Sequence, residues 1–292
     1  MDQLLTYLLP FAIGVIMFGI GLNLRLVHFK RVFTAPKAIL TGLTGQLVVL
    51  PLMGFLIAFI FPIDPVYKLG IVLLSACPGG ASSNIVTYML QGRVALSVSI
   101  TAFNSFLIII TIPFILSIGF KLFLASELGV ELSVYQTFKE VVFTVLIPVL
   151  AGMYVNHKWE HITDRLKSPL RIILPAILFV VFTIVLLNEN ENGGLSMGNY
   201  TSLIMPAIAL NIVVMIIGFY GAGWLGILHD GKYTIAIEMG LQNSALAMFL
   251  ANNVIQLDGL AVIAVLYGGF SFFSTLFIAF IMKHFLKSKE EV

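Results

Sequence analysis

Long apolar runs separated by short polar segments dominate this chain of 292 residues. About 20 apolar residues let a helix cross the hydrocarbon core of a bilayer. The chain is 59% hydrophobic and only 10% charged, whereas soluble domains carry about 25% charged residues. We therefore expect an all-α polytopic membrane protein, a single transmembrane domain covering 1–292. Its roughly nine predicted spans lie near 4–24, 38–61, 69–91, 94–120, 137–156, 169–187, 200–226, 233–253 and 259–283.

The positions of the basic residues predict the orientation of the chain. If the N-terminus lies outside, only Lys68, Lys121 and Lys139 of the 16 Lys and Arg residues fall in outside segments. Cytoplasmic loops carry the excess of Lys and Arg in membrane proteins. We therefore expect an outside N-terminus and an inside C-terminus, and we expect the protein in a bacterial cytoplasmic membrane. The first apolar run lacks the basic start of a signal peptide, so it is interpreted as a span.

Several classes of function have little support in the sequence. It has no basic patch with interleaved aromatic residues, so we expect no nucleic-acid partner. The single cysteine, Cys77, rules out an internal disulfide. The predicted spans carry no H-E-x-x-H, no G-x-S-x-G and no catalytic pair of carboxylates. We therefore expect no enzyme, no cofactor and no obligate protein partner.

Two predicted spans contain residues that break helices. The stretch Pro78–Gly80 interrupts the third span, because proline removes a backbone donor and glycine holds a helix poorly. Free N–H groups near Ala81 and Ser82 would then open a second half-helix, which suits an anionic substrate. A proline-kinked packing helix is an equally good explanation of this span taken alone.

The eighth predicted span carries the only acid deep inside an apolar run. Glu238 precedes Gly240, Gln242 and Asn243. A charge at membrane depth costs roughly 2.5 to 3.5 kcal/mol, so such an acid indicates a functional site. Glu238 and Gln242 share a face if the helix is continuous. No basic residue inside the membrane compensates Glu238, so a bound cation is one possibility, and a buried protonated carboxyl is the alternative.

Neutral oxygens lie at corresponding depths in other spans. Ser97 and Thr101 lie four residues apart, with Asn104 and Ser105 one turn further, and this spacing places them on one helix face. Hydroxyl oxygens are hard ligands for a small cation, although hydrogen bonding between helices is the favoured explanation for this span alone. Gln46 lies in the middle of the second span and is open to the same two interpretations. The third and eighth spans run in opposite directions, which predicts an inverted repeat of the kind found in secondary transporters.

Three stretches resemble the signatures of the bile acid:sodium symporter family. They are G-V-I-M-F-G-I-G-L-N-L from Gly14 to Leu24, S-A-C-P-G-G-A-S-S-N-I-V-T-Y-M-L-Q-G-R-V-A-L-S-V-S-I-T from Ser75 to Thr101, and I-E-M-G-L-Q-N-S from Ile237 to Ser244. The resemblance covers essentially the whole chain. It implies two discontinuous helices that cross, a panel domain at 1–30 and 137–190, and a core domain at 38–124 and 200–286.

The resemblance also implies two sodium ions bound behind the crossing and an organic anion held between core and panel. The first sodium site would use Ser83, Asn84, Ser97, Thr101 and Glu238. The second would use Gln46, Glu238, Gln242 and backbone carbonyls around Met239 and Leu241. The anion would lie near Ala81, Ser82 and Asn243, with Ser274 where some relatives carry a His-Asn pair.

These observations predict a sodium-coupled secondary active symporter that imports an organic anion by alternating access. The resemblance suggests a bile acid, or a small carboxylate such as pantoate or a 2-keto acid. A proton-coupled carrier, in which Glu238 titrates, is one alternative, although the neutral oxygens favour sodium. A membrane ligand sensor that does not transport is another, although the tail at 283–292 is too short for an output domain.

Overall fold

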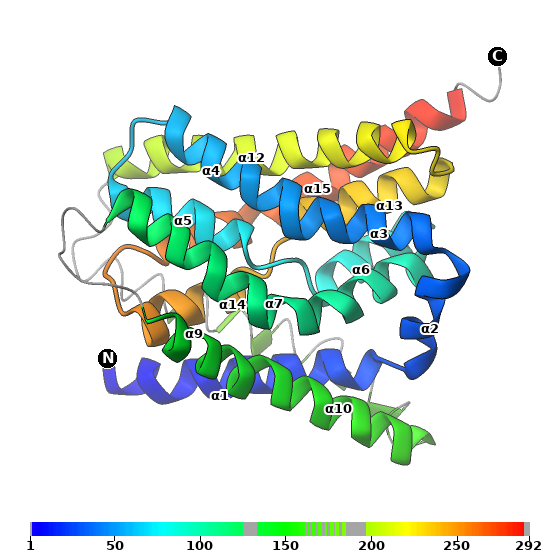
Figure 1. Cartoon of the computed structure of the whole chain (residues 1–292), viewed down its shortest axis with the longest axis horizontal. Coiled ribbons are helices and arrows are strands. Elements are labelled where there is room, and N and C mark those ends of the chain that lie inside the picture. The colour runs from blue at the N-terminus through cyan, green and yellow to red at the C-terminus, as the bar shows by residue number, and fades with distance from the viewer. Residues whose placement is uncertain are drawn as a thin grey trace.

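The computed structural model describes residues 2–124, 133–161 and 197–288, with scattered positions between 163 and 184. Within this part the regular elements are all helices (Figure 1). In chain order they are α1 (Asp2–Asn23), α2 (Leu26–Thr34), α3 (Pro36–Thr44), η1 (Gly45–Val49), α4 (Leu50–Ile60), α5 (Pro65–Ser75), α6 (Ala81–Met89), α7 (Val94–Phe123), α9 (Val134–Val141), η2 (Val142–Leu146), α10 (Ile147–Lys158), α12 (Met197–Trp224), α13 (His229–Gly240), α14 (Ser244–Phe249), η3 (Leu250–Ile255) and α15 (Val262–Ser288).

The predicted all-α membrane architecture is confirmed by the long apolar helices. Among the described residues, five helical stretches are long and apolar enough to cross a membrane: 36–60, 94–123, 134–158, 201–224 and 262–286. Each lies within a few residues of a predicted span. The predicted sixth span at 169–187 falls largely outside the described residues, so the count of nine stays a prediction.

The connection between the first two predicted spans contains a short helix, α2. It carries His28, Lys30 and Arg31 among apolar residues, a pattern typical of a helix lying in the membrane interface. Phe29 of α2 packs edge-on against Phe103 of α7, with ring centroids 5.3 Å apart. A nine-residue helix is too short to be detected by a search for apolar runs of about 20 residues.

Helices α1 and α10 pack closely along one side of the molecule, opposite α4 and α12 (Figure 1). A Cβ atom on Gly21 would lie 2.2 Å from the carbonyl oxygen of Val149. A Cβ on Gly152 would lie equally close to the carbonyl oxygen of Phe18. The two glycines therefore let the two backbones touch, as small residues do where membrane helices cross. Both helices belong to the predicted panel, and the division into panel and core stays a prediction.

Candidate functional site

Two broken helices meet at the centre of the site. The first break separates α5 from α6 and the second separates α13 from α14. The backbone N–H of Asn243 donates to the carbonyl oxygen of Cys77 at 2.9 Å. Pro78 and Gln242 form a single antiparallel bridge. Free backbone groups at membrane depth must find partners within the protein, so each break provides hydrogen bonds that the other lacks. The two breaks thus contact each other, whereas the crossing of the two helices and the inverted repeat stay predictions.

Gly79 is required by this close approach. A Cβ atom at this position would lie 2.3 Å from the carbonyl oxygen of Leu241. Real Cβ atoms do not approach backbone oxygens so closely, and the opposing backbone has no flexible atom that can move aside. The absence of a side chain at Gly79 therefore lets the two breaks come this close.

Glu238, near the end of α13, is fully buried and lies among neutral hydrogen-bond donors. The Ser97 hydroxyl donates to its Oε1, and the Thr101 hydroxyl lies 3.5 Å from its Oε2. Gln46 Nε2 lies 3.3 Å from Oε2 and donates to the Glu238 carbonyl oxygen at 2.6 Å. The Ser97 hydroxyl is also 2.6 Å from Asn84 Oδ1. Predicted ligands from three segments, η1, α6 and α7, thus gather around one carboxylate of α13.

A wide helical turn brings Gln46 into this cluster. Residues Gly45–Val49 form a π-helical turn between α3 and α4, and such turns often occur at functional sites. Gly45 lies against Met239, since a Cβ there would be 2.7 Å from Met239 Sδ. The amide of Asn104 donates to Gln46 Oε1 and so fixes which end of Gln46 faces Glu238. Asn104, on the same face of α7 as Ser97 and Thr101, was not among the predicted site residues.

The remaining predicted sodium ligands lie within the two breaks. Buried Ser83 donates to the carbonyl oxygen of Gly80 at 2.8 Å. Gln242 Nε2 donates to the Met239 carbonyl at 2.5 Å. Its Oε1 is buried and has no hydrogen-bond partner among the described residues. Glu238 and Gln242 would share a helix face only in a continuous helix, and α13 ends at Gly240, between the two residues.

The cluster places a buried carboxylate among neutral groups. No basic side chain of the described residues pairs with Glu238. The ion pairs found among these residues lie elsewhere and join Arg25 to Glu160 and Arg93 to Asp230. Burying a carboxylate costs several kcal/mol unless another charge compensates it. The surrounding groups are neutral: the hydroxyls of Ser97 and Thr101, and the amide of Gln46, which presents its nitrogen to the carboxylate. Hydroxyl and amide oxygens are ligands that hard cations prefer. The residues present therefore fit a small hard cation such as sodium.

The predicted anion-binding residues do not all lie together. Ala81 opens α6, and Ser82 follows it half-buried. Asn243 caps α14 by accepting from the Leu246 N–H at 3.1 Å. A Cβ atom on Gly80 would lie 3.4 Å from Ile20 of α1 and 3.8 Å from Asn243 Nδ2. This part of the crossing therefore faces α1.

Ser274 belongs to a second buried polar cluster, which the sequence analysis missed. Its hydroxyl donates to Asn211 Oδ1 at 2.8 Å. The carbonyl oxygen of Gly240, at the end of α13, accepts from Asn211 Nδ2 at 2.7 Å, from the Tyr267 hydroxyl at 2.6 Å and from the Thr275 hydroxyl at 3.1 Å. Side chains from α12 and α15 thus donate to the carbonyl of Gly240, which follows Met239 and precedes Leu241 in the sequence. Asn211 lies deep in the seventh predicted span, and a polar residue at that depth could have indicated this cluster.

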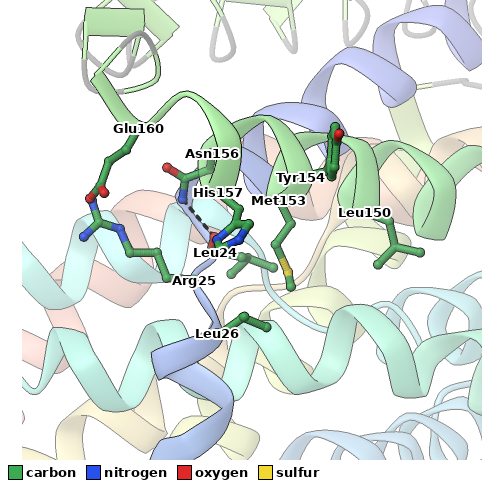
Figure 2. Close-up of a pocket in the computed structure, with 9 residues that line it drawn as sticks. All are labelled: Leu24, Arg25, Leu26, Leu150, Met153, Tyr154, Asn156, His157 and Glu160. Carbon is green, nitrogen blue, oxygen red and sulfur yellow. Dashed lines mark hydrogen bonds and ion pairs between the residues drawn. The ribbon is translucent and has the colours of Figure 1, made fainter.

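A pocket of about 390 Å³ lies apart from this site, between the ends of α1 and α10 (Figure 2). Arg25 Nη2 and Glu160 Oε1 form an exposed ion pair of 2.7 Å at its rim. Asn156 Nδ2 donates to the Leu24 carbonyl at 2.9 Å. None of the predicted site residues line this pocket. The pocket therefore lies where α1, α2 and α10 meet and is separate from the residues around Glu238.

Known proteins resemble this chain over most of its length. The model of the Sodium Bile acid symporter family matches residues 10–193. The "Probable sodium/metabolite cotransporter BASS1, chloroplastic" of Arabidopsis thaliana is 32% identical over 81% of this chain and 57% of its own length. The "Ileal sodium/bile acid cotransporter" of Cricetulus griseus is 32% identical over 88% of this chain and 70% of its own. The "Uncharacterized sodium-dependent transporter YocS" of Bacillus subtilis is 29% identical, with 82% and 72% covered. The chain thus spans little more than half the length of the plant relative.

Proposed function

The chain belongs to the sodium bile acid symporter family, and we propose that it is a sodium-coupled symporter that imports an organic anion by alternating access. The observation that carries the proposal is Glu238, a fully buried carboxylate surrounded by neutral oxygens and amides. A bound sodium ion would compensate its charge, and the neighbouring oxygens would replace the water of the ion.

We propose two sodium sites that share this carboxylate. One would use the α6 and α7 side chains Ser83, Asn84, Ser97 and Thr101. The other would use Gln46 and Gln242 with the carbonyls of Met239 and Leu241. The buried Gln242 Oε1, which has no partner among the described residues, supports the second site, because a buried acceptor left unpaired is costly.

Coupling would follow from the position of Glu238 beside the crossing. Sodium held by Glu238 would join α13 to α6, α7 and η1, and so fix the two breaks against each other. The half-helix that begins at Ala81 would then present its free N–H groups to the anion. Sodium and anion must each raise the affinity for the other by the same factor. The anion would lie against α1, near Ser82 and Asn243, with Ser274 contributing from α15.

Two sodium ions moving with one monovalent anion would carry net positive charge inward. Each elementary charge crossing the membrane is worth about 2.3 kcal/mol per 100 mV, so transport would be driven by the membrane potential as well as by the sodium gradient. The relatives are named for bile acids and for metabolites. We propose an organic anion of the same kind, a bile acid or a small carboxylate such as pantoate or a 2-keto acid.

The proposal is tested by thermal unfolding of the purified protein with a bile acid, pantoate and a 2-keto acid, each in sodium and in potassium. We expect at least one anion to raise the melting temperature in sodium and to have no effect in potassium. Equal stabilisation in both salts would contradict sodium coupling. Uptake into vesicles that ignored sodium but followed a pH gradient would indicate a proton-coupled carrier, and saturable binding without uptake would indicate a sensor.

A further inference from the structure

A groove of about 370 Å³ lies on the part of the molecule away from α1 and α10. It is bounded by α3 and η1 on one side and by α12 and α13 on the other, and its walls are mostly apolar. Leu40 and Leu225 flank it and are more than half exposed. Gly221 of α12 faces open space, because a Cβ atom there would meet nothing within 4 Å. The groove is therefore open to the surface and is not filled by the protein itself.

Two lysines lie over the end of α12 that is predicted to face the cytoplasm. Lys37 lines the groove, and its Nζ is 3.5 Å from the Cβ position of Gly226. Lys232 Nζ is 3.5 Å from the Cβ position of Gly223. Gly223 and Gly226 are one turn apart, joined by a backbone hydrogen bond of 2.9 Å, so both ammonium groups lie over the end of α12. Within the described part of the chain, neither lysine forms an ion pair with a carboxylate.

An aromatic side chain marks the depth of these lysines. Trp224, in the same turn of α12, is 86% exposed. Exposed tryptophans of membrane proteins gather at the level of the lipid headgroups. Lysines at that level attract anionic lipids. The groove thus combines an apolar channel with a positive end at headgroup height.

We propose that this groove binds one membrane phospholipid with an anionic headgroup. Its phosphate would lie between Lys37 and Lys232, and one acyl chain would run along the groove towards Met239. The charge of the two lysines selects this occupant over a zwitterionic phospholipid, and the apolar walls select it over a free phosphate.

The inner end of the groove reaches the cation cluster. Met239 lines the groove, and its Sδ packs between Gly45 of η1 and Gly218 of α12. The carbonyl of the same residue accepts from Gln242 at 2.5 Å. An acyl chain in the groove would restrict the movement of Met239. The lipid would therefore stabilise the end of α13 that carries Glu238.

The test measures binding of dioleoyl phosphatidylglycerol to the detergent-purified protein by native mass spectrometry, with dioleoyl phosphatidylcholine as the neutral comparison. Gly221→Leu places a side chain in the groove, starting from a Cβ that meets nothing within 4 Å, and should abolish retention of phosphatidylglycerol. The double variant Lys37→Gln/Lys232→Gln should weaken binding about 30-fold, since each lysine near the surface contributes about 5-fold. Thr44→Leu narrows the groove from the opposite wall and serves if Gly221→Leu does not fold.

Matched controls separate the groove from general effects on the membrane surface. Gly14→Leu fills a helical position of α1 where a Cβ atom also meets nothing within 4 Å. Lys121→Gln removes a lysine from the last turn of α7, which does not line the groove. Both should bind phosphatidylglycerol like the unmodified protein. Unchanged binding by the groove variants, or equal binding of phosphatidylcholine and phosphatidylglycerol, would overturn the proposal. Retention of free inorganic phosphate with the same lysine dependence would also overturn it, because the acyl chain would then be unnecessary.

Discussion

Replacing Glu238 by glutamine removes the charge on which the proposed sodium sites depend, while keeping nearly the same shape. Glu238 is fully buried, so a size-changing substitution would also disturb packing. The introduced amide still offers an oxygen to the Ser97 hydroxyl. We expect Glu238→Gln to fold, to lose sodium-dependent stabilisation and to lose sodium-driven uptake.

The expected loss of sodium affinity can be calculated from the burial of the carboxylate. Two opposite charges about 4 Å apart attract by about 4 kcal/mol at an effective dielectric constant of 20. Each 1.4 kcal/mol corresponds to a factor of ten in affinity, so the variant should bind sodium about 1,000-fold more weakly. In sodium-free buffer the variant should be at least as stable as the unmodified protein, because an unpaired buried charge has been removed.

Sodium titration followed by thermal unfolding measures both effects. Glu140→Gln is the matched control, because it makes the same change at a half-buried residue of α9 that is not among the residues around Glu238. It should leave the sodium dependence unaltered. If Glu238→Gln kept a sodium affinity within about 10-fold of the unmodified protein, a difference of only about 1.4 kcal/mol, the carboxylate would not be a ligand and the reasoning would fail.

Further predictions concern the groups around Glu238. Gln46→Ala should weaken sodium binding by about 1 to 3 kcal/mol, because a buried polar contact is lost. A sodium titration measures this change. An unchanged midpoint of the sodium titration would exclude Gln46 as a ligand. Gly79→Ala should abolish uptake and lower the melting temperature, because its Cβ would lie 2.3 Å from the Leu241 carbonyl oxygen; normal uptake would show that the breaks can separate freely. Tyr267→Phe removes one of the three side chains that donate to the Gly240 carbonyl. It should lower the free energy of unfolding by about 1 kcal/mol and slightly weaken sodium binding. Thermal unfolding in sodium and in potassium measures both effects. An inside-negative potential imposed with valinomycin should accelerate uptake, and an unchanged rate would indicate electroneutral transport.

Much of the fold could be predicted because membrane helices follow from length and hydrophobicity. The breaks were also predictable, since Pro78 and its neighbouring glycines cannot continue α5. Glu238 stood out because an acid is rare at that depth, and Ser97 and Thr101 because helical spacing places them on one face. These signals are local, so a single sequence contains them.

Other features depend on contacts between distant segments and leave no local signal. The π-helical turn that brings Gln46 to Glu238 has no marker in residue type. The Gly240 carbonyl receives side chains from positions 211, 267 and 275, and a backbone acceptor cannot be identified from its own residue. Ser274 was expected to face the anion because of its position in a motif. Its hydrogen bond to Asn211 joins it to the polar cluster at the end of α13, and its contribution to the anion site stays a prediction.

Uptake of radiolabelled organic anions into proteoliposomes, under an inward sodium gradient, tests sodium-coupled symport most directly. A bile acid, pantoate and a 2-keto acid are each measured with the unmodified protein and with Glu238→Gln. We predict that at least one anion accumulates above its equilibrium level in sodium, that potassium does not replace sodium, and that the variant does not accumulate it. Accumulation that is equal in potassium, or that persists in Glu238→Gln, would contradict the account.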